Sequence, residues 1–229
     1  MGEMVEFPSN GTSGTGYLAT PPSGGAGIGL VVIQEWWGLV DHIKDVCDRF
    51  ADEGFTALAP DLYHGESVDE PDEAGKLMMA LNLDKAGKDM GGAVDFLRAH
   101  DKVRGDGVGV TGFCMGGGLA LVLACQRPDA VKACVPFYGV IPWQNAQPDW
   151  SGLQAPVQMH IAENDGFFGP DAARQLESQL KDLGKEVELH VYEGAEHAFF
   201  NDTRPEVYDE SAASTAWTRA LEFLRAKLG

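Results

Sequence analysis

Three observations predict an α/β fold with a mainly parallel central sheet and helices on both faces. Residues 28–34, 131–138 and 156–162 are short, almost continuously apolar runs, as expected of strands covered on both sides. Helical patterns alternate with these runs along the chain. A glycine-flanked cysteine, Cys114, stands where one such run passes into a helix. The length of 229 residues suits one well-buried core, so we expect a single domain over residues 1–229.

The N-terminal half is expected to begin with an antiparallel hairpin at a sheet edge. Residues 4–8 and 15–20 flank an Asn10-Gly11 turn, and the Pro/Gly/Ser-rich segment 21–27 is a loop. Glycines at positions 91 and 92 weaken the last helix of this half. The remaining elements are a strand at 28–34, a helix from Asp41, as its cap, to about Glu53, a strand at 55–59, and helices at 72–81 and 84–100.

The C-terminal half continues the alternation. A strand beginning at Val108 enters Cys114, and the sequence G-G-G-L-A-L-V-L-A that follows is typical of a buried helix. The other elements are strands at 131–138, 156–162 and 187–192, and helices at 170–183 and 210–228.

Charge and cysteine content exclude several classes of function. Lysine and arginine minus aspartate and glutamate give 17 − 35 = −18, which repels phosphate backbones and anionic membranes, so we expect neither a nucleic acid nor a membrane as partner. The four cysteines have no zinc-site spacing, so no metal is expected. With no export signal, we expect a cytoplasmic protein with free thiols.

The sequence around Cys114 carries the strongest chemical signal. G-F-C-M-G has the Gly-x-Cys-x-Gly spacing of a nucleophile elbow, with cysteine in place of serine. Ligands of such sheets bind beyond the carboxyl ends of the strands, where Glu35, Asp165 and His197 also lie. The chain order nucleophile, acid, histidine is that of an α/β-hydrolase triad, which predicts the α/β-hydrolase fold.

Each residue type has a task in acyl transfer. Cys114 would attack a carbonyl carbon, His197 would take and return the proton, and Asp165 would orient the imidazole. The backbone N–H groups of Met115 and Trp36 are the expected donors to the oxyanion.

Structural explanations compete with these assignments. Glu35 can be read as a loop charge, and Glu163 and Asp171 compete with Asp165 as the acid, or serve only in a turn and a helix cap. We expect the other cysteines to be buried apolar residues and the other histidines to be capping or surface residues. These are Cys47, Cys125 and Cys134, and His42, His64, His100, His160 and His190.

The chain resembles the dienelactone hydrolase (carboxymethylenebutenolidase) family over nearly its whole length. The resemblance implies a monomer-like α/β-hydrolase fold, at most a weak homo-oligomer, and cofactor-free hydrolysis of a cyclic enol ester. It also implies a triad of Cys114, Asp165 and His197, and a Glu35 that holds the thiol at rest and helps to ionise it when substrate binds. The matching motifs are Q-E-W-W-G at 34–38, A-P-D-L-Y at 59–63, G-F-C-M-G-G at 112–117, F-Y-G at 137–139, N-D at 164–165 and G-A-E-H-A-F at 194–199.

Two arginines that grip a substrate carboxylate in that family are missing. Residues 62–97 contain no arginine, and Asn201 stands four residues beyond His197, with Arg204 as the nearest cation. Lys76 is another candidate cation, and Ala198 replaces a hydroxyl residue. We therefore expect weak activity on dienelactone and a preference for a less charged or bulkier ester. The residues expected to shape an aromatic pocket are Trp36, Trp37, Phe113, Tyr138, Phe167, Phe168 and Phe199; those expected to bind substrate are Trp37, Tyr138, Phe199 and Arg204.

Three functional hypotheses follow. The first is a cysteine hydrolase that cleaves an activated lactone or ester, with a small molecule as its partner. The second is a broad carboxylesterase on the same scaffold, and the third is a non-catalytic ligand or redox sensor that uses the Cys114 thiol.

Overall fold

The computed structural model describes residues 1–9 and 11–229, so Asn10 of the expected hairpin turn lies outside the described residues. The strands are β1 (Glu3–Ser9), β2 (Thr12–Ala19), β3 (Gly27–Ile33), β4 (Phe55–Pro60), β5 (Val103–Phe113), β6 (Val131–Phe137), β7 (Val157–Asn164) and β8 (Val187–Glu196). The helices are α1 (Asp41–Asp52), α2 (Pro71–Met79), α3 (Leu83–Ala99), α4 (Met115–Gln126), α5 (Pro170–Asp182) and α6 (Glu210–Leu228), with short 3₁₀ turns at Gln144–Ala146 and Trp150–Gly152.

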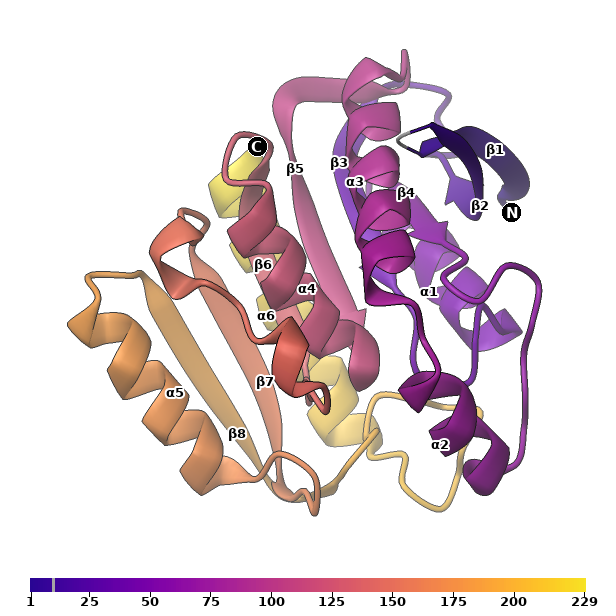
Figure 1. The fold of residues 1–229 in the computed structure, drawn as a ribbon. Helices are drawn as coiled ribbons and strands as arrows, with labels where there is room; N and C mark the ends of the chain where they lie inside the picture. Colours follow the sequence, from indigo (N-terminus) through magenta and orange to yellow (C-terminus); the bar gives the residue numbers. More distant parts are fainter. Residues whose placement is uncertain (10) are drawn as a thin grey trace.

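Within the described chain, the strands form one sheet in the order β1-β2-β4-β3-β5-β6-β7-β8. The β1/β2 and β2/β4 pairs are antiparallel, and every pair from β4/β3 to β7/β8 is parallel (Figure 1). The carboxyl ends of the parallel strands therefore meet at one edge of the sheet. The predicted edge hairpin and parallel centre agree with this topology.

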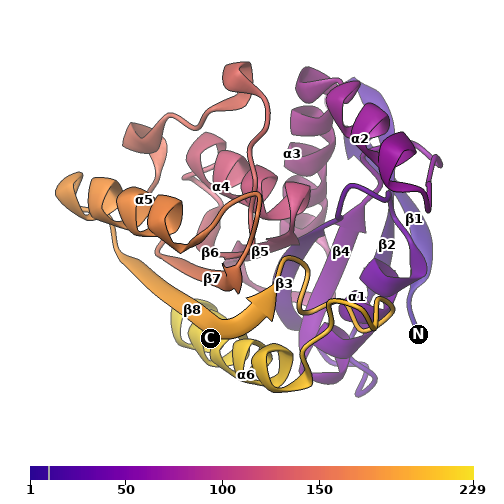
Figure 2. The same cartoon turned by 90° about the horizontal axis from the view of Figure 1, so that it is seen from below.

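Helices cover both faces of the sheet, as predicted. Helices α1 and α6 lie on one face, and α3, α4 and α5 lie on the other (Figure 2). Helix α4 is buried on all sides, from Met115 to Cys125, which explains why its sequence is apolar without amphipathic periodicity. The central strand β3 and helix α4 thus form the middle of the core.

Several element boundaries differ from the sequence prediction. Helix α1 starts at Asp41 itself, and its N-cap is Val40 without a side-chain hydrogen bond, so Asp41 as a cap was wrong. Strand β5 starts at Val103 rather than Val108, and its pairing with β6 shifts register between Val108 and Gly109. Strand β8 extends to Glu196, which carries the chain directly to His197.

Helix α3 is continuous despite its two central glycines. A Cβ atom added at Gly92 would lie 2.5 Å from the carbonyl oxygen of Pro8, in β1. The glycine allows the edge hairpin to pack tightly on the helix, and this tertiary contact outweighs the low helix propensity of glycine.

The expectation for the histidines was wrong at two positions. His42 and His160 are 3% and 0% exposed. His42 lies on α1 with its ring 6.4 Å from that of Phe113, and His160 lies in β7 with its ring stacked on that of Phe137 at 4.5 Å. The Nδ1 and Nε2 atoms of His160 lie 2.7 Å from the Tyr192 hydroxyl and 3.1 Å from Gln158 Oε1, which compensates its burial. The expectation for Cys47, Cys125 and Cys134 is confirmed, because all three are buried, free thiols.

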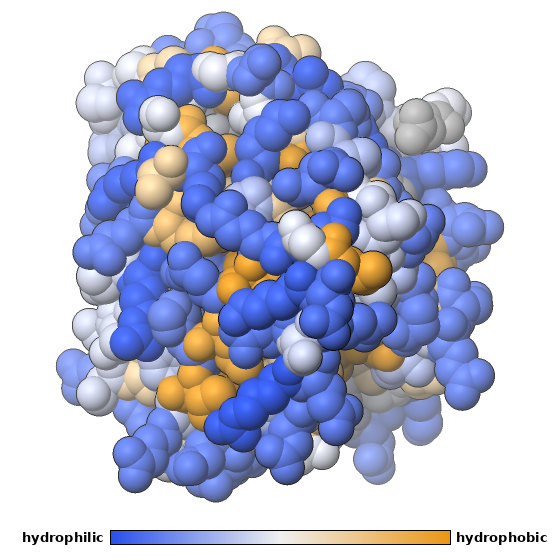
Figure 3. All heavy atoms as spheres, turned by 90° about the vertical axis from the view of Figure 1, so that its left-hand side faces the viewer, coloured by the Kyte–Doolittle hydropathy of each residue, from blue (hydrophilic) through white to orange (hydrophobic). Residues whose placement is uncertain are grey.

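The surface on the α5 side of the molecule is mostly polar. Figure 3 views the side that carries α5 and shows hydrophilic residues over most of that face, with hydrophobic groups in smaller patches between them. In the part of the chain that the structure describes, no helix combines the length and apolar character needed to span a membrane.

Candidate active site

Cys114 lies at the sharp turn between β5 and α4. Its φ and ψ are 55° and −120°, a conformation that is unfavourable for a residue with a side chain. The neighbouring glycines allow the turn to close: a Cβ atom at Gly112 would lie 2.1 Å from the Gly116 carbonyl oxygen, and one at Gly116 would lie 2.3 Å from that of Ile33. The Gly-x-Cys-x-Gly sequence therefore builds a strained strand-to-helix turn.

The thiol of Cys114 is nearly buried, with 8% of the residue exposed. Burial raises its pKa, and the negative charge of Glu35 raises it further. The backbone N–H groups of Met115 and Trp36 act in the opposite direction and lower the pKa, because donors near the sulfur favour the thiolate. The two backbone amides that the sequence analysis predicts as oxyanion donors therefore both act on the side chain of Cys114.

His197 and Asp165 are brought together from the ends of β8 and β7. The Nδ1 atom of His197 lies 2.8 Å from Oδ2 of Asp165, whose side chain is fully buried. The other carboxylate oxygen, Oδ1, accepts hydrogen bonds from the backbone N–H groups of Phe167 and Phe168, at 2.8 and 3.0 Å. Asp165 therefore fixes both the imidazole and the loop that follows β7.

The second ring nitrogen of His197 has no hydrogen-bond partner among the described residues. It is buried, and the His197 ring lines the same cavity as Cys114. An imidazole held through Nδ1 by a carboxylate, with Nε2 free, is arranged to accept a proton from a group in that cavity.

Glu35 follows β3 and is 1% exposed. Burial raises the pKa of this carboxyl, and the hydrogen bond from Asn201 and the charges of His197 and Arg204 oppose that rise. The Asn201 Nδ2 donates to Glu35 Oε2 at 2.8 Å, whereas Oε1 has no partner in the described chain. Glu35 is therefore part of the buried site rather than a loop charge.

Asn201 is a member of the buried site that sequence reasoning missed. From the sequence alone, this position is notable only because an arginine is absent there. Its Oδ1 accepts hydrogen bonds from the N–H and hydroxyl of Thr203, at 3.1 and 2.6 Å, which orients the amide toward Glu35. The sequence offers one weak signal for this role, an amide residue shortly after the motif histidine.

These groups open into a cavity of about 480 Å³ beyond the carboxyl ends of the strands. Arg204 lies over the Trp37 ring at 5.4 Å and pairs with Glu206 at 2.8 Å, so it is the cation of this wall. Lys76 is not among the lining residues. Those residues are Glu35, Trp36, Trp37, Pro71, Met78, Cys114, Val140, Asn164, Gly166, Phe167, Glu196, His197, Ala198, Arg204 and Val207.

Tyr138 and Phe199 do not line this cavity, in contrast to the expectation that they bind substrate. Both are fully buried. The Tyr138 ring packs against His197 at 5.1 Å and against Phe199 at 5.4 Å, so the two aromatics support the imidazole from behind. Phe113 is likewise a core residue. The sequence could not separate the two roles, because an aromatic residue after a strand end is equally suited to core and pocket.

The groups of this site are arranged in a way that suits acyl transfer. It supplies a thiol, an oriented imidazole and two backbone donors around one cavity. Among the described residues, no group of three or more histidine, cysteine, aspartate or glutamate side chains is placed to hold a metal ion.

Comparison with known proteins identifies similar chains. The model of the dienelactone hydrolase family matches residues 15–228. "Protein usf" of Aquifex pyrophilus is 42% identical over 231 residues, 98% of each chain. The "Putative carboxymethylenebutenolidase" of Aquifex aeolicus is 39% identical and covers 100% of both chains. The crystal structure of a "Putative Dienelactone Hydrolase" from Klebsiella pneumoniae is 28% identical, covers 98% of each chain and superposes with a TM-score of 0.87.

Proposed function

This chain belongs to the dienelactone hydrolase family, and from that premise we propose that it hydrolyses an activated lactone or ester through a thioester on Cys114. The observation that carries the proposal is the convergence of three groups on one cavity. These are the elbow thiol, the imidazole held by Asp165, and the N–H groups of Met115 and Trp36.

Acylation begins with loss of the Cys114 proton to Nε2 of His197, the ring nitrogen that has no hydrogen-bond partner in the described chain. The sulfur then bonds to the substrate carbonyl carbon, and the carbonyl oxygen becomes an oxyanion that accepts hydrogen bonds from Met115 and Trp36. When this adduct collapses, the carbon–oxygen bond to the leaving group breaks and His197 returns the proton to that oxygen. Asp165 stabilises the imidazolium throughout.

Deacylation repeats the sequence with water as nucleophile. His197 takes a proton from water, and the hydroxide adds to the thioester carbon. The carbon–sulfur bond then breaks to release the acid, and His197 returns the proton to the Cys114 sulfur. A thiolate leaves a tetrahedral adduct readily, so productive acylation needs an alkoxide or enolate that leaves at least as easily. A lactone whose leaving group is a conjugated enolate, or an aryl ester, meets this requirement.

Glu35 is proposed to keep the resting thiol neutral. Its charge, together with burial, raises the pKa of Cys114, so the resting enzyme holds little thiolate. This protects the sulfur from unrelated electrophiles. It also disfavours a thiol sensor, which needs a low-pKa, accessible cysteine.

A broader carboxylesterase activity is the second candidate, and the walls of the cavity favour it. Arg204 is the one arginine or lysine among the lining residues, and Trp36, Trp37 and Phe167 supply large apolar surfaces. One cation beside a buried carboxylate is a weak site for a substrate carboxylate. We therefore expect neutral activated esters to be better substrates than dienelactone.

Turnover of dienelactone and of neutral p-nitrophenyl esters by the same enzyme tests both the thioester mechanism and the expected preference for neutral esters. We expect higher kcat/KM on the neutral esters, and a loss of at least about 10³-fold in the Cys114→Ala variant. Full turnover by Cys114→Ser would contradict a mechanism that depends on the thiol. A strong preference for dienelactone would contradict the expected substrate charge.

A further inference from the structure

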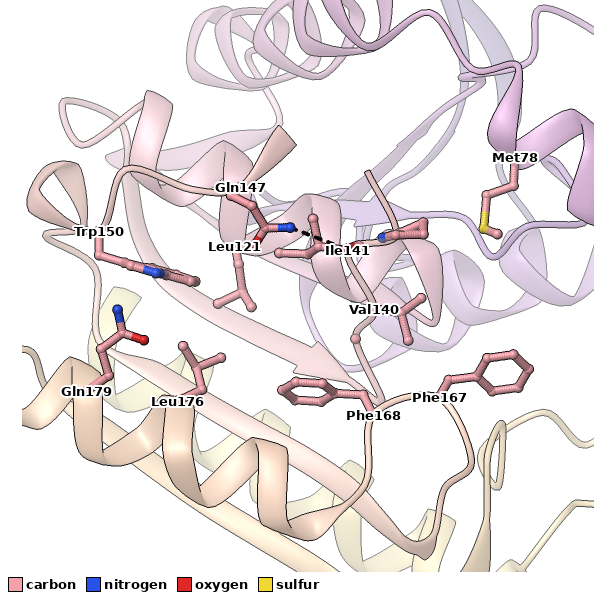
Figure 4. A pocket seen from close by; sticks show the side chains of 12 residues that line it. Met78, Leu121, Val140, Ile141, Gln147, Trp150, Phe167, Phe168, Leu176 and Gln179 are labelled. Atoms are coloured by element: carbon pink, nitrogen blue, oxygen red, sulfur yellow. Dashed lines mark hydrogen bonds between the residues drawn. The ribbon is translucent and has the colours of Figure 1, made fainter. Parts of the chain in front are cut away.

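A second cavity of about 370 Å³ lies beside the first and shares three wall residues with it, Met78, Val140 and Phe167. It lies between α4, α5 and the segment that follows β6 (Figure 4). Its volume lies within the range of small-molecule sites. Its further lining residues include Leu121, Gln147, Trp150, Phe168, Leu176 and Gln179.

The elbow itself fixes one wall of this second cavity. The Val140 backbone N–H donates to the Cys114 carbonyl oxygen at 3.1 Å, so the segment after β6 lies directly on the nucleophile turn. A Cβ atom at Gly118 would lie 1.9 Å from the Val140 carbonyl oxygen, which shows how closely the two segments pack. The second cavity is therefore held in a fixed position relative to Cys114.

The catalytic-site carboxylate fixes the opposite wall. Asp165 accepts the N–H groups of Phe167 and Phe168 through Oδ1 while Oδ2 contacts His197. The two phenylalanines point in different directions: Phe168 lies toward Leu176 and Trp150, and Phe167 lies toward Met78 (Figure 4).

Phe167 stands at the boundary between the two cavities. Its ring lies 4.8 Å from that of His197 and 6.4 Å from that of Trp36, and the residue is 69% exposed. The exposed ring therefore presents apolar surface beside the imidazole, where both cavities meet. Substrate that covers it would remove apolar surface from water.

We propose that the second cavity binds an unbranched apolar chain of the ester whose carbonyl group reacts at Cys114. This inference rests on the proposed function and extends it to a substrate class, esters with a medium-length aliphatic group. The polar groups of the cavity are neutral: the Gln147 amide donates to the backbone carbonyls of Ile141 and Trp143, at 3.4 and 3.2 Å. No lysine, arginine, aspartate or glutamate is among its lining residues, so an apolar chain enters without desolvating a charge.

Two ester series test the proposal and distinguish the side of the ester that is bound. One series is p-nitrophenyl acetate, butyrate, hexanoate and octanoate; the other is acetate esters of 4-alkylphenols of increasing alkyl length, whose aryl leaving groups meet the requirement for acylation. Burial of each methylene favours binding, so kcat/KM should rise about two- to fourfold per added methylene in one of the series.

Three variants test whether the dependence of kcat/KM on chain length arises in the second cavity. Leu176→Trp fills it from α5 and should lower kcat/KM on the longest good substrate at least tenfold, with less than a twofold change on p-nitrophenyl acetate. Gln179→Trp, at an exposed lining position, should do the same and is the second variant in case the first folds poorly. Ser178→Trp carries the same new side chain on the exposed side of α5 and should behave as wild type.

The possible outcomes distinguish a failure of this inference from a failure of the proposed function. If wild type hydrolyses acetate through Cys114 but both series are flat, or both filling variants affect all chain lengths alike, the second cavity is not a substrate site. If wild type hydrolyses none of the esters, the proposed function itself fails.

Discussion

The side-chain amide of Asn201 donates a hydrogen bond of 2.8 Å to the buried carboxylate of Glu35, across 166 residues of sequence. The contact joins the loop after β8 to the segment after β3. A neutral amide compensates a buried carboxylate less than a cation does, and the Glu35 Oε1 atom has no hydrogen-bond partner among the described residues. The site therefore holds an acid whose ionised form is only partly stabilised by its surroundings.

Replacing Glu35 by Gln should stabilise the protein at neutral pH. Burial raises the pKa of Glu35 above its ordinary value of 4.5, so the folded state favours the protonated form, and the stability this contributes is lost as pH rises through the folded pKa. Glu35→Gln removes that loss while its amide oxygen can still accept from Asn201. Its gain in unfolding free energy should be larger at pH 7 than at pH 4.5, as measured by urea titration.

The exposed Glu222 on α6 provides the control for this prediction. Glu222→Gln should change stability by less than about 0.5 kcal/mol at either pH. A Glu35→Gln variant that is less stable than wild type at pH 7 would show that the carboxylate is well compensated, contrary to this account.

Asp165→Asn should reduce kcat by roughly 10³-fold or more, because an amide no longer stabilises the imidazolium and favours the wrong tautomer of His197. Steady-state kinetics on a p-nitrophenyl ester measures the loss. Glu163→Gln is the matched control two residues away. Glu163 is exposed and accepts from the Gly194 N–H at 2.8 Å, so its variant should retain activity. Equal losses in both variants would argue against Asp165 as the acid.

Arg204→Gln should weaken the binding of esters that carry a carboxylate and leave the binding of neutral esters unchanged. Arg204 lines the reaction cavity, and a hydrogen-bonded ion pair with a substrate carboxylate contributes about 1.5–3 kcal/mol. We expect KM for an ester that bears a carboxylate to rise about tenfold or more, with KM for the neutral analogue unchanged. Lys76→Gln, outside the lining residues, should alter neither. An unchanged KM for the acidic ester in Arg204→Gln would remove Arg204 from substrate binding.

Gly116→Ala should destabilise the elbow. The added methyl group would lie 2.3 Å from the backbone oxygen of Ile33, and backbone cannot move aside cheaply. We expect a loss of about 2 kcal/mol or more, seen as a Tm lower by roughly 4–8 °C. Gly25→Ala, whose nearest neighbour is 3.6 Å away, should leave Tm within about 1 °C. A Gly116→Ala protein as stable as wild type would show that the turn can relax.

The fold was predictable because its strongest signals are local. Buried parallel strands appear as apolar runs, and the elbow needs glycine at fixed spacing from its nucleophile, so both can be found in sequence. The same is true of strand-end residues such as Asp165 and His197, whose separation in sequence is bridged by the rule that parallel strands end at one edge of the sheet.

The remaining features depend on contacts that no local pattern encodes. Gly92 allows close packing on β1, and His42 is buried where α1 packs against the sheet, although helix periodicity alone did not predict its burial. The hydrogen bond between Asn201 and Glu35 forms because the loop after β8 meets the segment after β3. The sequence of neither segment predicts this contact. Tyr138 packs behind His197 with Phe199 behind it, whereas Trp37 lines the cavity, and the sequence does not distinguish these positions.

Intact-protein mass spectrometry of acid-quenched reactions with p-nitrophenyl acetate tests the central claim most directly. We expect a transient mass increase of one acetyl group, located by peptide mapping on Cys114 and absent from Cys114→Ala, which should also have lost turnover. Buried Cys47, Cys125 and Cys134 serve as internal controls and should stay unmodified. An acetyl group on another residue, or turnover by Cys114→Ala at the wild-type rate, would contradict a thioester mechanism at the elbow.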